Sequence, residues 1–287
     1  MIIAMMNVSA GSKRSPFKAV RLINNEPLFI HSLNRVTSSV DVSRIIITTS
    51  TEPIDDLLTY NLMQMDFDVY RHSFQSPTSG DLLRQKAADY FGLKDDDIIV
   101  SPSADAPFAY RTDLHYQVEL LKNSDKEIIW SAPTDQFPIF DWEWAVTSPG
   151  VFKVSVLRNV LKHLPYSGLI KYGTEEALEA WRSVLRSGFF RPLFVQKTKE
   201  AAKSWDYQPL WVDEPGQFEK AKIILTEIGN NPPDSMIRTF LETRDDVLML
   251  AQNAPRRTVN AMCEDWECVK ALRKLAELEG VMSAYDE

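Results

Sequence analysis

The segment Gly11–Lys18 contains the residue types that bind phosphate groups. It has one glycine, two serines and three cations, namely Lys13, Arg14 and Lys18. Glycine lets main-chain N–H groups come close to a ligand, serine donates a hydroxyl group, and lysine and arginine neutralise phosphate charge. The apolar run Met1–Val8 before the segment predicts a buried strand. The segment is therefore a candidate phosphate-binding loop, with a solvated basic loop as the alternative.

Two aspartates follow segments that are predicted to be strands. Asp105 comes after the predicted strand Asp97–Ser101, and Asp213 comes after the predicted strand Leu210–Val212. Mg²⁺ in proteins favours one or two carboxylates together with substrate phosphates. The alternatives are a turn or helix-cap aspartate at Asp105 and a helix N-cap at Asp213. With the basic loop, the two carboxylates form a candidate phosphate and metal site.

Strands and helices alternate over the first two-thirds of the chain. Apolar patterning predicts strands at residues 44–50, 67–71, 97–101 and 127–131, and helices at 27–39, 53–64, 80–91 and 112–122. This alternation is typical of βαβ units and predicts an α/β fold with a mainly parallel sheet. Ligands of such sheets bind outside the carboxyl ends of the strands. We therefore expect the loops at residues 9–18, 71–81 and 102–108 to lie together.

The last third of the chain has a different pattern. Beyond Pro133 we expect helices at residues 155–163 and 174–187, a strand at 189–196, and a helix from Pro215 to about Gly229. The sequence Asn-Asn-Pro-Pro at residues 230–233 is a strong helix breaker, and helical patterning follows it. These features predict two domains, residues 1–229 and a C-terminal helical extension at residues 230–287.

Composition excludes several classes of protein. The chain has 287 residues, is 44% hydrophobic and carries a net charge of −8, so no global positive field favours nucleic acid or an anionic membrane. It has no apolar run of about 18 residues that would span a membrane, and its N-terminal apolar run is too short for a signal peptide. Cys263 and Cys268 fit neither a redox motif nor a zinc motif. We expect a cytoplasmic protein that binds a small anion, with no nucleic-acid or membrane partner.

Six segments, taken in order, resemble the cytidylyltransferases that make CMP-activated sugar acids. These include the CMP-Kdo and CMP-acylneuraminate synthetases and, most similar, their spore-coat-polysaccharide relatives. In the first segment, the matching residues are Gly11, Ser12, Arg14, Pro16 and Lys18. The other segments are Asn25–Leu28, Ile46–Asp56, Arg71 with Ser79–Asp81, Ser103–Phe108 and Leu210–Phe218. The resemblance covers residues 1–228.

The resemblance implies a fold, a reaction and a set of roles. The fold would be a Rossmann-like, GT-A-like nucleotidyltransferase layer, and an acceptor oxygen would attack the α-phosphorus of CTP and release pyrophosphate. The acceptor would be a sugar acid or a related acidic or phosphorylated compound of surface-glycan biosynthesis, and the protein would be a homodimer. The implied nucleotide-binding residues are Gly11, Ser12, Arg14 and Lys18 at the triphosphate, and Arg71, Ser79 and Gly80 around the cytidine. The implied catalytic residues are Arg14, Lys18 and Asp105, and the implied Mg²⁺ ligands are Asp105 and Asp213.

Three residues depart from the family pattern. Ser9 stands where the family has arginine, and Phe17 and Ala104 stand where it has glycine. Three possibilities follow: a divergent active enzyme, a nucleotidyltransferase with another nucleotide or a phosphonate acceptor, and a non-catalytic nucleotide-binding or scaffold protein. His72, beside Arg71, is a candidate general base, with a structural role as the alternative.

Overall fold

The fold is described from a computed structural model of the chain. It describes residues 1–11, 15–73, 80–109, 111, 114–123, 127–132, 150–163, 193–196, 210–213 and 215–250. The helix expected at residues 174–187 lies outside these ranges. In the described part of the chain, no helix is long and apolar enough to cross a membrane.

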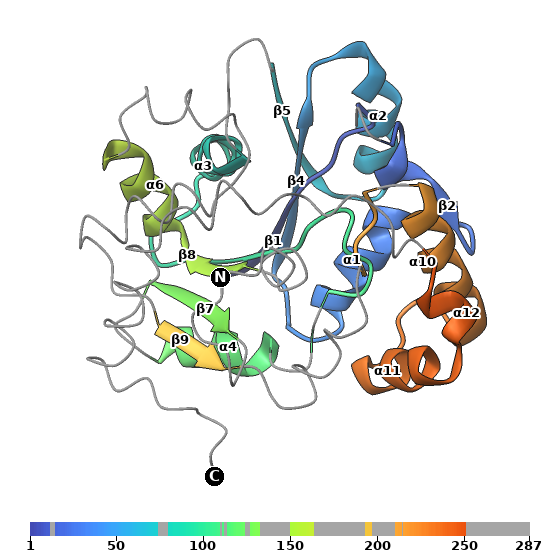
Figure 1. The fold of residues 1–287 in the computed structure, drawn as a ribbon. Coiled ribbons are helices and arrows are strands. Elements are labelled where there is room, and N and C mark those ends of the chain that lie inside the picture. Colours follow the sequence, from blue (N-terminus) through green and yellow to red (C-terminus); the bar gives the residue numbers. More distant parts are fainter. Residues whose placement is uncertain are drawn as a thin grey trace.

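The described residues form a seven-stranded mixed sheet in the order β5-β4-β1-β6-β8-β7-β9 (Figure 1). The strands are β1 (Ile2–Asn7), β4 (Arg44–Ser50), β5 (Asp68–His72), β6 (Ile98–Ser101), β7 (Ile128–Ala132), β8 (Gly150–Lys153) and β9 (Leu193–Gln196). The pairs β4–β5, β1–β4, β1–β6 and β7–β9 are parallel, and β8 is antiparallel to both of its neighbours. The predicted α/β fold with a mixed, mainly parallel sheet is confirmed.

Helices cover both faces of the sheet (Figure 1). Alternate residues of β1 point to opposite faces, so Ala4 and Met6 pack in one core cluster while Ile3 and Met5 pack in another. The first cluster includes residues of α1 (Leu28–Thr37), α2 (Asp56–Gln64) and α4 (Leu114–Lys122). The second includes residues of α3 (Gly80–Tyr90) and α6 (Val154–His163). Because both of its faces are covered, β1 is a continuous apolar run rather than an alternating one.

The C-terminal helices share a third core cluster with the N-terminal part of the chain. They are α10 (Pro215–Ile228), α11 (Asp234–Thr243) and α12 (Asp245–Leu248). Their apolar residues pack with Leu28 of α1, with Phe108, and with Ile23 of a small hairpin. That hairpin joins β2 (Leu22–Ile23) to β3 (Glu26–Pro27). Figure 1 shows α10 beside α1, with α11 and α12 beyond it. The boundary between residues 229 and 230 stays a prediction.

Two features of the structure differ from the predicted elements. The sequence did not indicate β8, which pairs with β6 and β7. The strand expected at Leu210–Val212 is wrong, because this segment has no strand pairing. Its Val212 N–H instead donates a single hydrogen bond to the carbonyl of Asp105, at 2.8 Å. A short apolar run was therefore mistaken for a strand.

Candidate active site

Three loops meet at the side chain of Lys18. Its Nζ donates to Oδ2 of Asp105 at 2.5 Å and to Oδ1 of Asp213 at 2.7 Å. The lysine side chain is only 11% exposed. These partners are 87 and 195 residues from Lys18 in the sequence, so the contacts depend on the fold.

The sheet brings these loops together. β1 and β6 are parallel neighbours, so the loops after their carboxyl ends emerge side by side. Lys18 begins the short 3₁₀ helix η1 (Lys18–Val20), and its N–H donates to the carbonyl of Ser15 at 3.1 Å. The third loop is attached by the hydrogen bond from Val212 to Asp105. Of the three loops expected to lie together, those at residues 9–18 and 102–108 are joined by the contact between Lys18 and Asp105. Most of the third, at residues 71–81, lies outside the described residues.

Neighbouring side chains orient the two aspartates. Ser103 Oγ donates to Oδ1 of Asp105 at 2.6 Å. The N–H of Asp213 donates to Oε1 of Gln217, in the first turn of α10, at 2.6 Å. Thus Gln217 of α10 binds the backbone of Asp213, while the carboxylate of Asp213 contacts Lys18. These contacts orient the carboxylate of Asp105 and the backbone of Asp213.

A buried aspartate that the sequence analysis did not single out holds the start of the basic loop. Asp55 is fully buried and accepts hydrogen bonds from the N–H of Ala10 at 2.7 Å, from Oγ of Ser9 at 3.0 Å, and from Ser50. Ser9 Oγ in turn accepts the N–H of Gly11 at 3.0 Å. Ser9, at the position where the family pattern has arginine, therefore connects the loop to Asp55, in the segment after β4. The available signal was the pair of aspartates at 55 and 56, near the start of the helix expected at residues 53–64.

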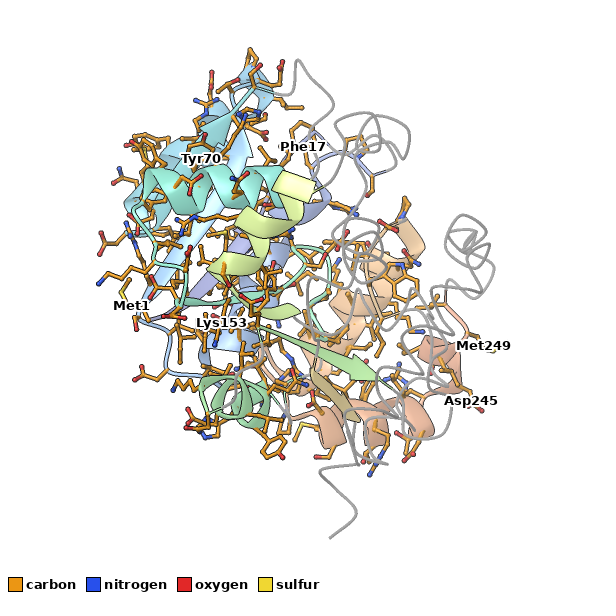
Figure 2. All side chains as sticks on the ribbon, turned by 90° about the vertical axis from the view of Figure 1, so that its left-hand side faces the viewer. Met1, Phe17, Tyr70, Lys153, Asp245 and Met249 are labelled. Atoms are coloured by element: carbon orange, nitrogen blue, oxygen red, sulfur yellow. The ribbon has the colours of Figure 1, made fainter. Side chains whose placement is uncertain are left out.

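The left-handed backbone of this loop is at Phe17 rather than at Gly11. Phe17 has φ 60° and ψ 12°, a conformation that glycine adopts without steric cost. Its side chain is 49% exposed, and Figure 2 shows it at the periphery of the molecule. Gly11 has no positive φ, and a Cβ there would meet Ser9 Oγ at 3.4 Å. The conformational freedom of Gly11 is therefore not required in this structure.

Arg71, which was predicted to lie around the cytidine, has its contacts away from Lys18. Arg71 Nε donates to the carbonyl of Ser50 at 2.9 Å, and its Nη2 donates to Oδ1 of Asp56 at 2.6 Å. Arg71 thus joins β5 to the end of β4 and the start of α2, and β5 lies two strands away from β1. Gly80 is the first residue of α3. Ser12, Arg14 and Ser79 lie outside the described residues.

His72, the candidate general base, lies at the end of β5. Burial lowers its pKa from the ordinary 6.5, and the positive charge of Lys86 lowers it further. Its Nε2 is buried and has no hydrogen-bond partner in the described part of the chain. The imidazole is therefore neutral at pH 7. Arg71, its neighbour, has its guanidinium in a structural contact.

The donor set fits a divalent cation of the Mg²⁺ type. Asp105 and Asp213 each place a carboxylate oxygen within 2.7 Å of the same cationic nitrogen, Lys18 Nζ. Mg²⁺ prefers oxygen ligands and binds through one or two carboxylates plus substrate phosphates. The described residues contain no group of three or more metal-ligating side chains. Substrate phosphates and water are the further ligands that Mg²⁺ commonly takes.

The comparisons with known proteins agree on one family. Residues 8–167 match the model of a family described as cytidylyltransferase. A curated relative, 3-deoxy-manno-octulosonate cytidylyltransferase 2 from Hydrogenovibrio crunogenus (strain DSM 25203 / XCL-2), is 25% identical over 139 residues. That match covers 48% of this chain and 54% of the relative, so the chain spans about half the length of the curated relative it matches.

Solved structures of cytidylyltransferases share the fold. A cytidylyltransferase from Leptospira borgpetersenii serovar Hardjo-bovis (strain JB197) superimposes with a TM-score of 0.68 at 17% identity, over 86% of this chain and 96% of that one. CMP:2-keto-3-deoxy-manno-octonic acid synthetase, solved in complex with CTP, gives a TM-score of 0.54 at 14% identity, over 79% of this chain and 98% of that one. The resemblance stated from the sequence motifs is confirmed.

Proposed function

The chain belongs to the cytidylyltransferase family, and we propose that it transfers CMP from CTP to an acidic sugar with release of pyrophosphate. The observation that carries this proposal is the convergence of Lys18, Asp105 and Asp213 at the carboxyl end of the sheet. A lysine and two carboxylates from three different loops are the groups that hold a triphosphate and its counter-ion.

In this proposal Lys18, Gly11, Ser12 and Arg14 bind the triphosphate of CTP. Lys18 is held by the backbone of η1, so its ammonium can stabilise the charge that builds on the leaving pyrophosphate. Asp105 and Asp213 are the ligands of Mg²⁺, which when bound polarises phosphoryl oxygens. Ser103 orients the carboxylate of Asp105, and Gln217 holds the backbone of Asp213. Positioning of the acceptor oxygen against the α-phosphorus supplies the rest of the rate enhancement.

We assign the acceptor to the sugar acids or to related acidic or phosphorylated compounds. The support is the name of the curated relative, which acts on 3-deoxy-manno-octulosonate. A place in surface-glycan biosynthesis follows from that acceptor class. The contacts of Arg71, Ser79 and Gly80 with cytidine, the homodimer and the cytoplasmic location stay predictions.

The test is pyrophosphate release with CTP and Mg²⁺ across a panel of sugar acids that includes Kdo and acylneuraminates. We expect release that requires CTP, Mg²⁺ and one acceptor class together. A thermal-shift comparison of the four nucleoside triphosphates separates a cytidylyltransferase from an enzyme that uses another nucleotide. CTP binding without any release, unchanged in the Asp105→Ala and Asp213→Ala variants, would favour the non-catalytic alternative.

A further inference from the structure

The ammonium group of Lys18 stands where the two predicted metal ligands converge. Its Nζ lies 2.5 Å from Asp105 Oδ2 and 2.7 Å from Asp213 Oδ1. A Mg²⁺ ion bound to the same two oxygens would lie about 2.1 Å from each of them. Such an ion would lie no more than about 4 Å from Nζ, so the two positive charges would repel each other while they compete for the same two oxygens.

We propose that Lys18 competes with the divalent cation for Asp105 and Asp213, and that the cation binds tightly only after the ammonium is drawn away. Its new partner would be an oxyanion, such as a phosphate of the bound nucleoside triphosphate. This inference rests on the proposed function for the nature of that oxyanion. The competition itself rests only on the two ion pairs.

The structure allows the side chain of Lys18 to move without its backbone. The N–H of Lys18 bonds to Ser15, and the carbonyl of Phe17 accepts the N–H groups of Val20 and Arg21, both at 3.0 Å. These bonds fix the start of η1. The four-carbon stem beyond it is flexible, and its compact ammonium can change partners at small cost in geometry.

The two aspartates, in contrast, also have contacts that do not involve Lys18. Asp105 is oriented by Ser103 Oγ, and the backbone of Asp213 by Gln217. We therefore expect the two carboxylates to stay close to each other when the ammonium leaves. Two like charges held close together repel each other, so a cation between them is strongly favoured.

Nucleotide and cation would then bind cooperatively. A triphosphate gives Lys18 a replacement partner and gives the cation additional oxygen ligands. Each ligand therefore raises the affinity of the other by the same factor, as linkage requires. Without the nucleotide, the lysine keeps the site in a low-affinity state for divalent cations.

The experiment measures Mn²⁺ binding to the full chain without any nucleotide, by the paramagnetic relaxation of water protons. The variants Lys18→Met and Lys18→Gln remove the charge, and Lys18→Gln keeps a donor that bridges the carboxylates and so protects the fold. We expect both to bind Mn²⁺ about tenfold more tightly than the unmodified protein. Lys18→Arg, which keeps the charge, is the matched control and should stay weak.

A second substitution shows where the ion binds. Adding Asp213→Asn to Lys18→Gln should abolish the gain in Mn²⁺ affinity. The proposal is overturned if neither neutral variant gains affinity, or if the gain survives Asp213→Asn. Because no CTP is present, the Mn²⁺ measurements do not depend on turnover. If the neutral variants gain Mn²⁺ affinity but the protein never releases pyrophosphate, the proposed function is refuted and the competition between Lys18 and the cation is still supported.

Discussion

At the scale of single residues, the chemistry depends on one lysine that faces two carboxylates. The sequence indicated Lys18, Asp105 and Asp213 as site residues, because residue types and a family resemblance both pointed to them. It did not indicate that Lys18 pairs with both aspartates, because partners 87 and 195 residues away are determined by the fold. Asp55 was overlooked for the same reason, since its role depends on backbone groups of the basic loop.

Removal of either carboxylate should strongly reduce pyrophosphate release. We expect Asp105→Asn and Asp213→Asn each to lower the rate about 100-fold or more, because each removes a charge that positions Lys18 and the metal. Steady-state rates with CTP and the preferred acceptor provide the measurement, with circular dichroism as the check on folding. Asp41→Asn, at an exposed position, is the matched control and should leave the rate unchanged.

Phe17 is predicted to be a site of backbone strain. A left-handed backbone costs a non-glycine residue about 1–2 kcal/mol, and Phe17 is about half exposed, so its side chain stabilises the fold little. Phe17→Gly should therefore raise the free energy of unfolding by about 1 kcal/mol once the extra chain entropy of glycine is included. Phe17→Ala keeps the strain and serves as the control. In urea unfolding, a Phe17→Gly variant less stable than Phe17→Ala would show that the strain is not present.

His72 should make the fold less stable in weak acid. Its pKa in the folded protein is lowered by burial and by Lys86, so the unfolded chain takes up a proton near pH 6.5 that the folded chain does not. The contribution of His72 to stability is therefore fully present above pH 6.5 and is lost as the pH falls through the lower folded pKa. An NMR titration should give a His72 midpoint below 6.5. The variant His72→Gln should show a smaller loss of stability between pH 7 and pH 5, and an unchanged slope would count against this account.

At the scale of elements, the parallel part of the sheet could be predicted and the antiparallel part could not. The strand at residues 44–50 was predicted with its observed bounds, because β-branched runs between helices have a strong local signal. β8 is only four residues long and follows a proline, so its pairing with β6 has no local signal. The third loop of the site, which carries Asp213, was predicted to follow a strand. In the structure, its only described backbone link to the Asp105 loop is the hydrogen bond from Val212.

A buried ion pair attaches the C-terminal helices to α1. Arg35 is fully buried and donates to Oδ1 of Asp234, at the start of α11, while its Nε donates to the carbonyl of Ala109 at 3.0 Å. The N–H of Arg111 also donates to Asp234, at 3.2 Å. Because Arg35→Met leaves the charge of Asp234 buried without its cationic partner, we expect this variant to lower the free energy of unfolding by about 3–5 kcal/mol.

A double-mutant cycle checks this prediction. Arg35→Met combined with Asp234→Leu removes both charges and should be less destabilised than the sum of the two single variants. Lys222→Met, at an exposed position on α10, is the control and should change stability by less than about 0.5 kcal/mol. Additive effects in chemical denaturation would contradict a coupled pair.

At the scale of the whole molecule, the sheet order explains why distant segments form one site. β1 lies between β4 and β6, so the loop after β1 contacts Asp55 after β4 on one side and Asp105 after β6 on the other. The C-terminal part contributes Asp213, and its helices pack in one core with Leu28 of α1. The site therefore requires residues from both ends of the described chain, which explains why no single motif could define it.

The most direct test of the central claim follows the phosphorus atoms of CTP. The protein is incubated with Mg²⁺, the preferred sugar acid and CTP labelled with ³²P at either the α or the γ position. We predict that the α label appears in the sugar product and the γ label in pyrophosphate, in equal amounts, and that both are lost in Asp213→Asn. Appearance of the γ label as inorganic phosphate, or no transfer of the α label to any acceptor that binds, would contradict the account.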